Sequence, residues 1–368
     1  MVSEPAAGPL AGLKVIEFAG IGPVPLAGML LADMGADVVC IARPGAIPTD
    51  PRQIVSRGRR WIALDLKAAA HCANARTLMA AADVVLEGFR PGVMERLGLG
   101  PQIALADNPR LIYGRMTGWG QEGPLAASAG HDIDYIAITG ALDAIRGAEG
   151  RPTQPLNLVG DYGGGTMFLL MGVLAGLVHA RDTGRGQVVD AAMCDGVVSL
   201  LSLFHAQAAL GKWGEPGTNS LDGGAPFYGT YRCADGKFIA VGALEPQFYA
   251  ELRRRAGLEE PLFDQQWDRG RWPAMHARMA EVFASRTREE WAALFEGSDA
   301  CVAPVLALDE APSHPHLRAR GSFIDRDGLW QAAPAPRFSA TPSQVPDRPM
   351  GVTIVPEDLL AQWTPPSL

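Results

Sequence analysis

Cysteines are few in this sequence, and their spacing excludes the common cysteine-based sites. The five cysteines are odd in number and include no Cys-x-x-Cys pair, which argues against a disulfide framework and against a zinc or redox motif. Four of them stand among apolar or small residues, so we expect reduced, buried thiols in a reducing compartment. This usage favours a cytoplasmic protein.

Long apolar runs are equally scarce. The longest, Met167–Val178, has twelve residues and is interrupted by Gly172 and Gly176, whereas a membrane-spanning helix needs about 20. The N-terminal residues show no charged stretch followed by an apolar run, so no secretory signal is predicted. We therefore expect no membrane as partner.

Charged and aromatic side chains are not concentrated as nucleic-acid binding requires. The net charge is −8 at pH 7, and no aromatic residues are interleaved with the arginine clusters. Nucleic acid is therefore not an expected partner. The sequence also lacks a Gly-x-Ser-x-Gly elbow and a P-loop, which excludes the hydrolase and nucleotide sites built on those motifs.

The N-terminal half alternates strand and helix signals. Leu13–Phe18 has the pattern of a buried strand, and Pro25–Met34 that of a helix ended by Gly35. Further strands are expected at residues 37–41, 61–64, 83–86, 110–116 and 187–193, and a long helix at 166–181. This alternation predicts an α/β protein whose large, Rossmann-like domain has a parallel sheet covered by helices.

The character of the chain changes after about residue 200. We predict a large domain over residues 1–200, a linker over 201–224, a small α+β domain over 225–310 and a C-terminal segment over 311–368 that returns to the large domain. Strands at 228–233 and 237–241 around the turn Ala234-Asp235-Gly236 are expected to form a β-hairpin in the small domain.

The first strand is followed by a partial dinucleotide fingerprint. Gly20 and Gly22 are in place, but Pro25 stands where a third glycine would allow close packing of the helix on the strand. The second strand ends at Arg43 rather than at an acidic residue that would bind an NAD ribose. Arg43 suits a phosphorylated ribose, although a plain surface arginine explains it equally well.

Arginines are clustered in two further places. Four lie within nine residues (Arg52, Arg57, Arg59, Arg60), and two more follow at Arg90 and Arg96. Because guanidinium groups match phosphate oxygens, such clusters in an acidic protein suggest a ligand that bears phosphate. An ordinary solvated face remains the alternative.

A histidine and an aspartate, His131 and Asp161, each follow a glycine and precede residues able to start a helix. An imidazole and a carboxyl that face each other can pass a proton through a substrate carbon, and helix N-termini stabilise a developing anion. Alone, the histidine could be a core residue and the aspartate a helix cap. The three glycines over 163–165 favour a ligand that approaches the backbone closely.

A metal site is not expected. Asp132 and Asp134 beside the histidine, and the pair His314 and His316, lack the further ligands that a metal ion requires.

The sequence resembles the family III CoA-transferase superfamily, and within it the racemases of 2-methylacyl-CoA thioesters, over nearly the whole chain. The motifs that carry the resemblance are Leu10–Glu17, Ile41–Gly45, Arg57–Arg60, Leu64–Lys67, Gly88–Gly92, Met116–Gln121, Gly130–Tyr135, Asn157–Asp161, Gly224–Tyr228 and Val241–Tyr249. One departure is Gly114 before Arg115, where members often carry alanine, and we expect no consequence from it.

The resemblance implies an interlocked homodimer, in which each active site lies between the large domain of one subunit and the small domain of the other. It implies that CoA lies on the large domain near Arg43, Arg90 and Arg96. No separate cofactor is implied, because CoA is part of the 2-methyl-branched acyl-CoA substrate.

The same resemblance implies that His131 and Asp161 are the two acid/base groups. Glu245 from the partner subunit would pair with the histidine, and Asn157 and Tyr135 would support the site around the aspartate. One group would remove the α-proton and the other would return a proton to the opposite face of the enolate. We expect backbone N–H groups of residues 161–165 to face the enolate oxygen and a desolvated site to keep the carboxyl protonated.

Three other functions stay open at the level of the sequence. A family III CoA-transferase would use Asp161 as nucleophile through an acyl-aspartyl anhydride, but would not need a histidine opposite it. A non-catalytic acyl-CoA-binding protein and an NADP oxidoreductase are the remaining alternatives. The sequence leaves open which acyl group is bound.

Overall fold

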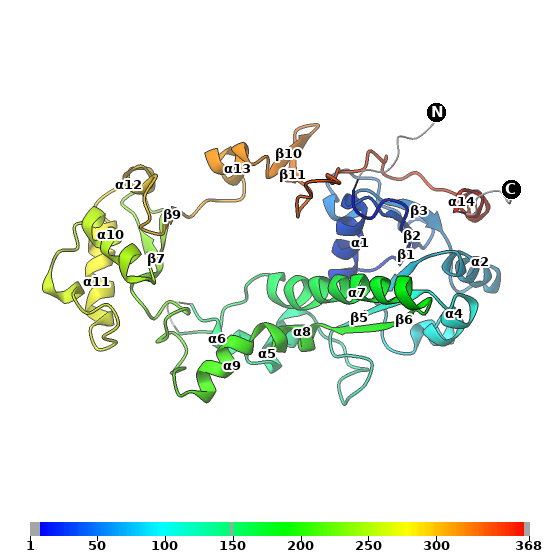
Figure 1. Cartoon of the computed structure of the whole chain (residues 1–368), viewed down its shortest axis with the longest axis horizontal. Helices are drawn as coiled ribbons and strands as arrows, with labels where there is room; N and C mark the ends of the chain where they lie inside the picture. Colours follow the sequence, from blue (N-terminus) through cyan, green and yellow to red (C-terminus); the bar gives the residue numbers. More distant parts are fainter. Residues whose placement is uncertain (1–7, 148–149, 364–368) are drawn as a thin grey trace. The chain divides into compact units, whose positions relative to one another are not determined.

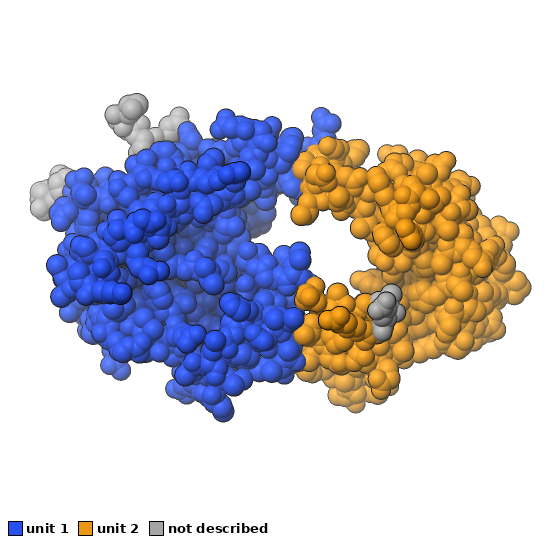
Figure 2. Space-filling model, turned by 180° about the vertical axis from the view of Figure 1, so that it is seen from behind, with its two compact units in different colours: residues 1–139, 155–201, 316–368 blue, residues 140–154, 202–315 orange. Residues whose placement is uncertain are grey.

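The computed structural model describes residues 8–147 and 150–363, which form two compact units. Unit 1 comprises described residues within 1–139, 155–201 and 316–368, and unit 2 those within 140–154 and 202–315 (Figure 2). Most of the predicted linker, residues 201–224, is thus part of unit 2. So is the segment 140–154, which the prediction assigned to the large domain. The outer ends of the predicted domains, residues 1–7 and 364–368, lie outside the described residues.

Unit 1 contains a six-stranded parallel sheet (Figure 1), as the strand pattern predicted. In spatial order the strands are β3 (Arg60–Ala63), β2 (Asp37–Ala42), β1 (Lys14–Phe18), β4 (Val84–Glu87), β5 (Ile112–Thr117) and β6 (Gln187–Ala192). Most residues of β1, β2, β4 and β5 are buried, which explains their nearly continuous apolar sequences. This strand order places the first strand at the centre, where the connections change direction.

Helices cover both faces of this sheet. Val15 of β1 lies in one core with Leu31 of α1 (Pro23–Asp33) and Val173 of α7 (Met167–Thr183). The next residue, Ile16, points to the opposite face because strand side chains alternate. There it shares a core with residues of α2 (Ala69–Ala80), α4 (Pro101–Asp107) and α14 (Pro356–Trp363).

Helix α7 continues an uncommon element. A π-helix, η2 (Leu158–Thr166), leads directly into it, so the helical stretch has 26 residues and not the sixteen that the sequence suggested. By length and composition this stretch could cross a membrane. Its contacts with β5 and β6 show that one side of α7 packs on the sheet of unit 1 (Figure 1), which explains the apolar residues Leu169, Leu170 and Val173. Met167, Met171 and Val178 on another side are exposed.

The glycines of η2 serve helix packing. A Cβ on Gly164 would lie 2.8 Å from the carbonyl oxygen of Met193, and a Cβ on Gly196 only 1.9 Å from the carbonyl oxygen of Gly164. Helix α8 (Met193–Leu200) therefore rests directly on the backbone of η2. The interpretation of the three glycines as a place of ligand approach is thus replaced by a packing requirement.

Unit 2 is a small α+β assembly. Its antiparallel sheet consists of β7 (Tyr228–Arg232), β8 (Phe238–Gly242) and β9 (Val302–Pro304), and the first two form the expected hairpin. The core is rich in aromatic rings, with Phe283 packed between Tyr231 and Trp291. The helices of this unit include α6 (Ala141–Ala144), α9 (Ser202–Ala209), α10 (Pro246–Ala256), α11 (Trp272–Phe283), α12 (Arg288–Phe295), η3 (Pro261–Phe263) and η4 (Ala311–Ser313).

The C-terminal residues from 316 onward belong to unit 1. They include the hairpin of β10 (Phe323–Arg326) and β11 (Leu329–Ala332), and a bridge joins Thr353 to Trp61 beside β3. The backbone N–H of Ile354 also donates to the Trp61 carbonyl over 2.9 Å.

Candidate active site

A pocket of about 340 Å³ opens in unit 1 at the carboxyl ends of the parallel strands. The segments after β1, β4 and β5 all reach it, so it lies at the point where the strand order reverses, the usual ligand position in such sheets. Its lining combines apolar residues with a few polar ones. The polar and charged side chains are Arg90, Thr117, Ser128, His131, Tyr135 and Asp161.

His131 stands immediately before α5 (Asp132–Ile138), in the N-cap position. Its backbone N–H donates to Oδ2 of Asp134 over 2.9 Å, which satisfies one of the donors at the helix start. The residue is exposed in the single chain and lines the pocket. The helix start therefore fixes the backbone of His131 at the pocket.

Tyr135 lies one turn further along α5 and holds the residue before the histidine. Its hydroxyl donates a hydrogen bond to the carbonyl of Gly130, and its ring packs edge-on against Trp119 at 4.7 Å. A Cβ on Gly118 would lie 2.0 Å from this ring, so the glycine makes room for it. Burial, with the nearby negative charge of Asp161, raises the pKa of Tyr135 to about 12. The tyrosine thus contacts the backbone beside His131.

Asp161 lies in the first turn of η2 and faces the same pocket. The Asn157 side-chain amide donates to its Oδ2 over 3.2 Å, and a Cβ on Gly22 would lie 3.1 Å from that oxygen. Burial raises the pKa of Asp161. The hydrogen bond from Asn157 opposes this rise, the charge of Asp132 adds to it, and His131 opposes it. The net result is a carboxyl that holds its proton more tightly than usual.

Asp132 is a site residue that sequence analysis treated only as a rejected metal ligand. It is 7% exposed, and its Oδ2 accepts the backbone N–H of Asp161 over 2.7 Å. Its Oδ1 is buried and has no hydrogen-bond partner among the described residues. The residue therefore joins the start of α5 to η2 and places a second carboxylate behind the first.

The backbone donors expected over residues 161–165 are already used. The N–H of Asp161 binds Asp132, and the N–H of Tyr162 donates to the Asn157 carbonyl within the π-helix. This expectation is wrong because η2 begins at Leu158, three residues before the position that the glycines suggested.

The first arginine cluster also has a different role from the one suggested. All four side chains pair with carboxylates, and two of the pairs are buried: Arg57 with Asp33, and Arg59 with Glu17. The others pair with Asp50 and Asp37. Arg57 and Arg59 therefore stabilise the fold and are not available to a phosphate, whereas Arg52 has only an exposed partner two residues away.

Arg43, Arg90 and Arg96 differ from that cluster. All three are exposed, and none has an ion pair with another described residue. Arg43 follows β2 and Arg90 follows β4, at the edge of the sheet where the pocket opens, and Arg90 lines the pocket. Arg96 ends the short helix α3 (Val93–Arg96).

Glu245 belongs to unit 2, where it stands in the N-cap position of α10. It is exposed, and its side chain has no hydrogen bond or ion pair with another described residue. The chain by itself therefore leaves this carboxylate available to a group from elsewhere.

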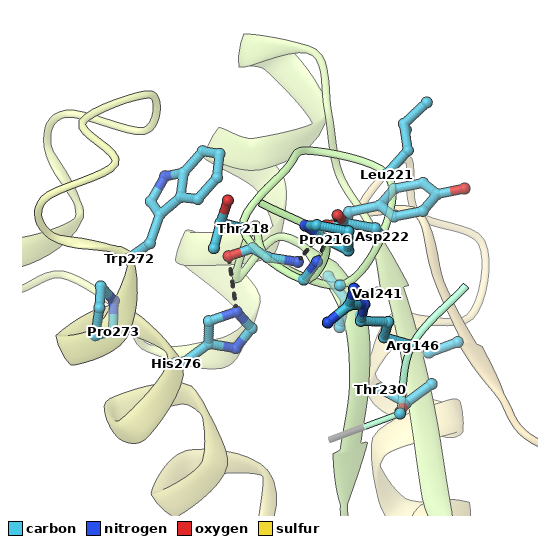
Figure 3. Close-up of a pocket in the computed structure, with 18 of the residues that line it drawn as sticks. Arg146, Pro216, Thr218, Leu221, Asp222, Thr230, Val241, Trp272, Pro273 and His276 are labelled. Carbon is cyan, nitrogen blue, oxygen red and sulfur yellow. Dashed lines mark hydrogen bonds between the residues drawn. The ribbon is translucent and has the colours of Figure 1, made fainter. Parts of the chain in front are cut away.

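A larger pocket of about 1180 Å³ lies within unit 2 (Figure 3). Its one histidine, His276, is engaged on both ring nitrogens, by the Tyr231 hydroxyl at 3.0 Å and by the Gly224 carbonyl at 3.1 Å. This arrangement supports the loop that ends at Gly224 and leaves no free acid/base group on the imidazole. In the described part of the chain, no group of three or more His, Cys, Asp or Glu side chains could hold a metal ion.

Comparisons with known proteins identify relatives that match nearly the whole chain. The chain is 47% identical to alpha-methylacyl-CoA racemase from Mus musculus and 45% identical to the one from Homo sapiens, in each case over 91% of this chain and 87% of the relative. A solved CAIB/BAIF family protein from Brucella suis has the same fold, with a TM-score of 0.79 at 24% identity over 97% of this chain and all of that one.

The family model described as CoA-transferase family III matches residues 10–351, which include the sheet, the pocket, His131 and Asp161. The chain belongs to CoA-transferase family III.

Proposed function

We propose that this protein is an α-methylacyl-CoA racemase, which interconverts the (R) and (S) forms of 2-methylacyl-CoA thioesters. The observation that carries the proposal is that His131 and Asp161 line one pocket, in a chain 47% identical to a racemase over 91% of its length. Two acid/base groups at one substrate carbon are what a racemisation needs.

The reaction breaks and re-forms a single C–H bond. One base takes the α-proton, and the electron pair of that bond delocalises into the thioester carbonyl as an enolate. The other group donates a proton to the opposite face, so the configuration inverts. Neutral His131 with protonated Asp161 serves one enantiomer, and the conjugate forms serve the other. The raised pKa of Asp161 supports this assignment because it favours the protonated carboxyl.

The enolate oxygen needs a donor other than residues 161–165. The first turn of α5 supplies one candidate, since the backbone N–H of Asp132 precedes the intrahelical hydrogen bonds and is adjacent to His131. We therefore place the thioester oxygen at this turn, between the two acid/base groups.

The CoA part of the substrate is assigned to the exposed arginines. Arg43, Arg90 and Arg96 are free of carboxylate partners within the described residues, and the first two follow β2 and β4, the parallel strands on either side of β1. Guanidinium groups recognise phosphate oxygens by paired hydrogen bonds, as the diphosphate and ribose phosphate of CoA require.

A homodimer completes the proposal. Unit 1 exposes an apolar area that includes Met167, Met171 and Val178 on one side of α7 and Val198 and Leu200 on α8. Such an area is typical of a surface that a second copy covers.

In this homodimer Glu245 of the partner subunit would accept a hydrogen bond from the His131 ring. A carboxylate in that position would set the tautomer of the imidazole.

The test is to incubate one enantiomer of a 2-methylacyl-CoA in deuterated water without any acceptor acid. Racemisation with deuterium at the α-carbon supports the proposal. The family alternative is a CoA-transferase in which Asp161 attacks the thioester as nucleophile. Acyl transfer to an added carboxylate, without α-exchange, would establish that alternative instead.

A further inference from the structure

A buried charged network lies beside the pocket and takes no part in the proposed chemistry. Its centre is Arg115 on β5, whose side chain is only 7% exposed. The Arg115 Nε donates to Oε1 of Glu87 over 2.9 Å, and its two Nη atoms donate to the Glu95 carboxylate over 2.8 and 3.3 Å. One planar guanidinium thus joins the end of β4 to helix α3.

Both carboxylates of this network lie next to an arginine that we assign to CoA. The second oxygen of Glu87 accepts the backbone N–H of Phe89 over 2.7 Å, and Phe89 directly precedes Arg90. Glu95 directly precedes Arg96 in α3. The network therefore fixes the backbone on both sides of the loop 88–92.

The two arginines also share this loop. Gly92 has φ 79°, and a Cβ on it would lie 3.3 Å from Nη1 of Arg96, so the Arg96 guanidinium lies beside the loop that carries Arg90. Their relative position depends on how the loop and α3 are joined. Two backbone hydrogen bonds join them, from the N–H of Val93 to the Arg90 carbonyl and from the N–H of Arg96 to the Gly92 carbonyl, each over 3.1 Å. Arg115 adds a side-chain link, because it binds Glu95 of α3 and also Glu87, which accepts the N–H of Phe89.

We propose that Arg115, through Glu87 and Glu95, is a positioning residue for the nucleotide end of CoA, because it sets the spacing of Arg90 and Arg96. The inference rests on the proposed function. A phosphate-bearing ligand that contacts both arginines binds best when their spacing is fixed beforehand. Arg115 itself contacts no substrate.

The variant Glu95→Gln separates a positioning role of this network from a purely structural one, because the two roles predict different changes in KM. The Glu95 side chain is 45% exposed, and Arg115 keeps its partner Glu87 in the variant, so we expect the protein to fold. Removing a negative charge next to Arg96 should by itself strengthen the binding of an anionic ligand and lower KM. Loss of the fixed spacing should raise KM. The two effects have opposite signs.

The experiment compares two substrates, a 2-methylacyl-CoA and the same acyl group on pantetheine, which lacks the nucleotide. For Glu95→Gln we expect KM for the CoA thioester to rise roughly three- to tenfold. We expect kcat, the melting temperature and KM for the pantetheine thioester to stay unchanged. Glu357→Gln removes the same charge from an exposed position of α14 and should change none of these values.

An unchanged or lowered KM for the CoA thioester overturns the proposal, and so does an equal rise for both thioesters. Arg115→Lys should behave like Glu95→Gln, because a single ammonium cannot hold both carboxylates in this geometry. If the wild type racemises neither thioester, the proposed function fails. Calorimetric binding of free CoA then decides the positioning role, since weaker binding to Glu95→Gln supports it and equal binding overturns it.

Discussion

At the scale of single residues, two neighbouring carboxyl groups, of Asp161 and Asp132, distinguish the pocket. Asp161 faces the pocket, and Asp132 lies behind it and accepts its backbone N–H. The negative charge of Asp132 raises the pKa of the Asp161 carboxyl, in addition to the effect of burial. Asp132 is therefore a residue that tunes Asp161.

Replacing Asp132 by Asn tests this effect. The amide oxygen can still accept the Asp161 N–H, but the negative charge that raises the Asp161 pKa is gone. Racemisation stops at low pH when both His131 and Asp161 carry a proton, because no base remains. A lower Asp161 pKa must move this loss of activity to lower pH.

The measurement is the pH dependence of kcat/KM. We expect the acidic limb of Asp132→Asn below that of the wild type, whereas Asp182→Asn, at the exposed end of α7, leaves it in place. An acidic limb that stays or moves upward would show that Asp132 does not raise the pKa of Asp161.

Sequence motifs singled out His131, Asp161 and Asn157, because these residues lie in the motifs Gly130–Tyr135 and Asn157–Asp161 that carry the family resemblance. They did not single out Asp132 as a partner of Asp161. An acidic residue in the first turn of a helix is common and carries no distinctive signal. Asp132 contacts Asp161 because η2 packs against α5, and only the tertiary structure shows this packing.

At the scale of elements, the contact between η2 and α8 positions Asp161. The two backbones touch at Gly164 and Gly196, where no side chain fits between them. The sequence predicted the strands of the sheet within about two residues, because buried parallel strands have continuous apolar runs. It did not predict the π-helix, because a run of glycines is equally compatible with a loop or a helix start.

Gly196→Ala should therefore damage both stability and activity. The new Cβ would lie 1.9 Å from the Gly164 carbonyl oxygen, so α8 and η2 must separate, at a cost of about 1–3 kcal/mol of unfolding free energy. We expect kcat to fall as well, because η2 carries Asp161.

Stability is measured by denaturant unfolding, and activity by racemisation kinetics, in Gly196→Ala and in a control variant. The matched variant Gly229→Ala, in a strand of unit 2 with no atom within 4 Å of the new Cβ, should lose neither stability nor activity. Wild-type stability in Gly196→Ala would mean that α8 does not rest on η2 as described.

At the scale of the whole molecule, buried ion pairs connect distant parts of unit 1. Arg57 binds Asp33 of α1 and also donates to the side chain of Gln331 and the carbonyl of Ala332, each over 2.8 Å. Arg57, one of the clustered arginines that suggested a phosphate ligand, thus connects α1 near the start of the chain to the C-terminal part. Composition alone could not separate these roles, since both use the same guanidinium group.

Arg57→Ala should destabilise unit 1 strongly. It leaves Asp33 buried without its counter-ion, and breaking a buried pair in this way typically costs about 3–5 kcal/mol. Arg52→Ala breaks an exposed pair with Asp50 and should change stability too little to measure. Chemical denaturation of the two variants makes the comparison, and equal stability would contradict the structural role of Arg57.

The central claim is that His131 and Asp161 act on opposite faces of one α-carbon. Its most direct test is α-proton exchange in deuterated water, measured by NMR on each pure enantiomer with His131→Ala and Asp161→Asn. We predict that neither variant racemises and that each still exchanges one enantiomer, a different one in the two variants. Exchange of the same enantiomer by both variants, or racemisation by either, would contradict the claim.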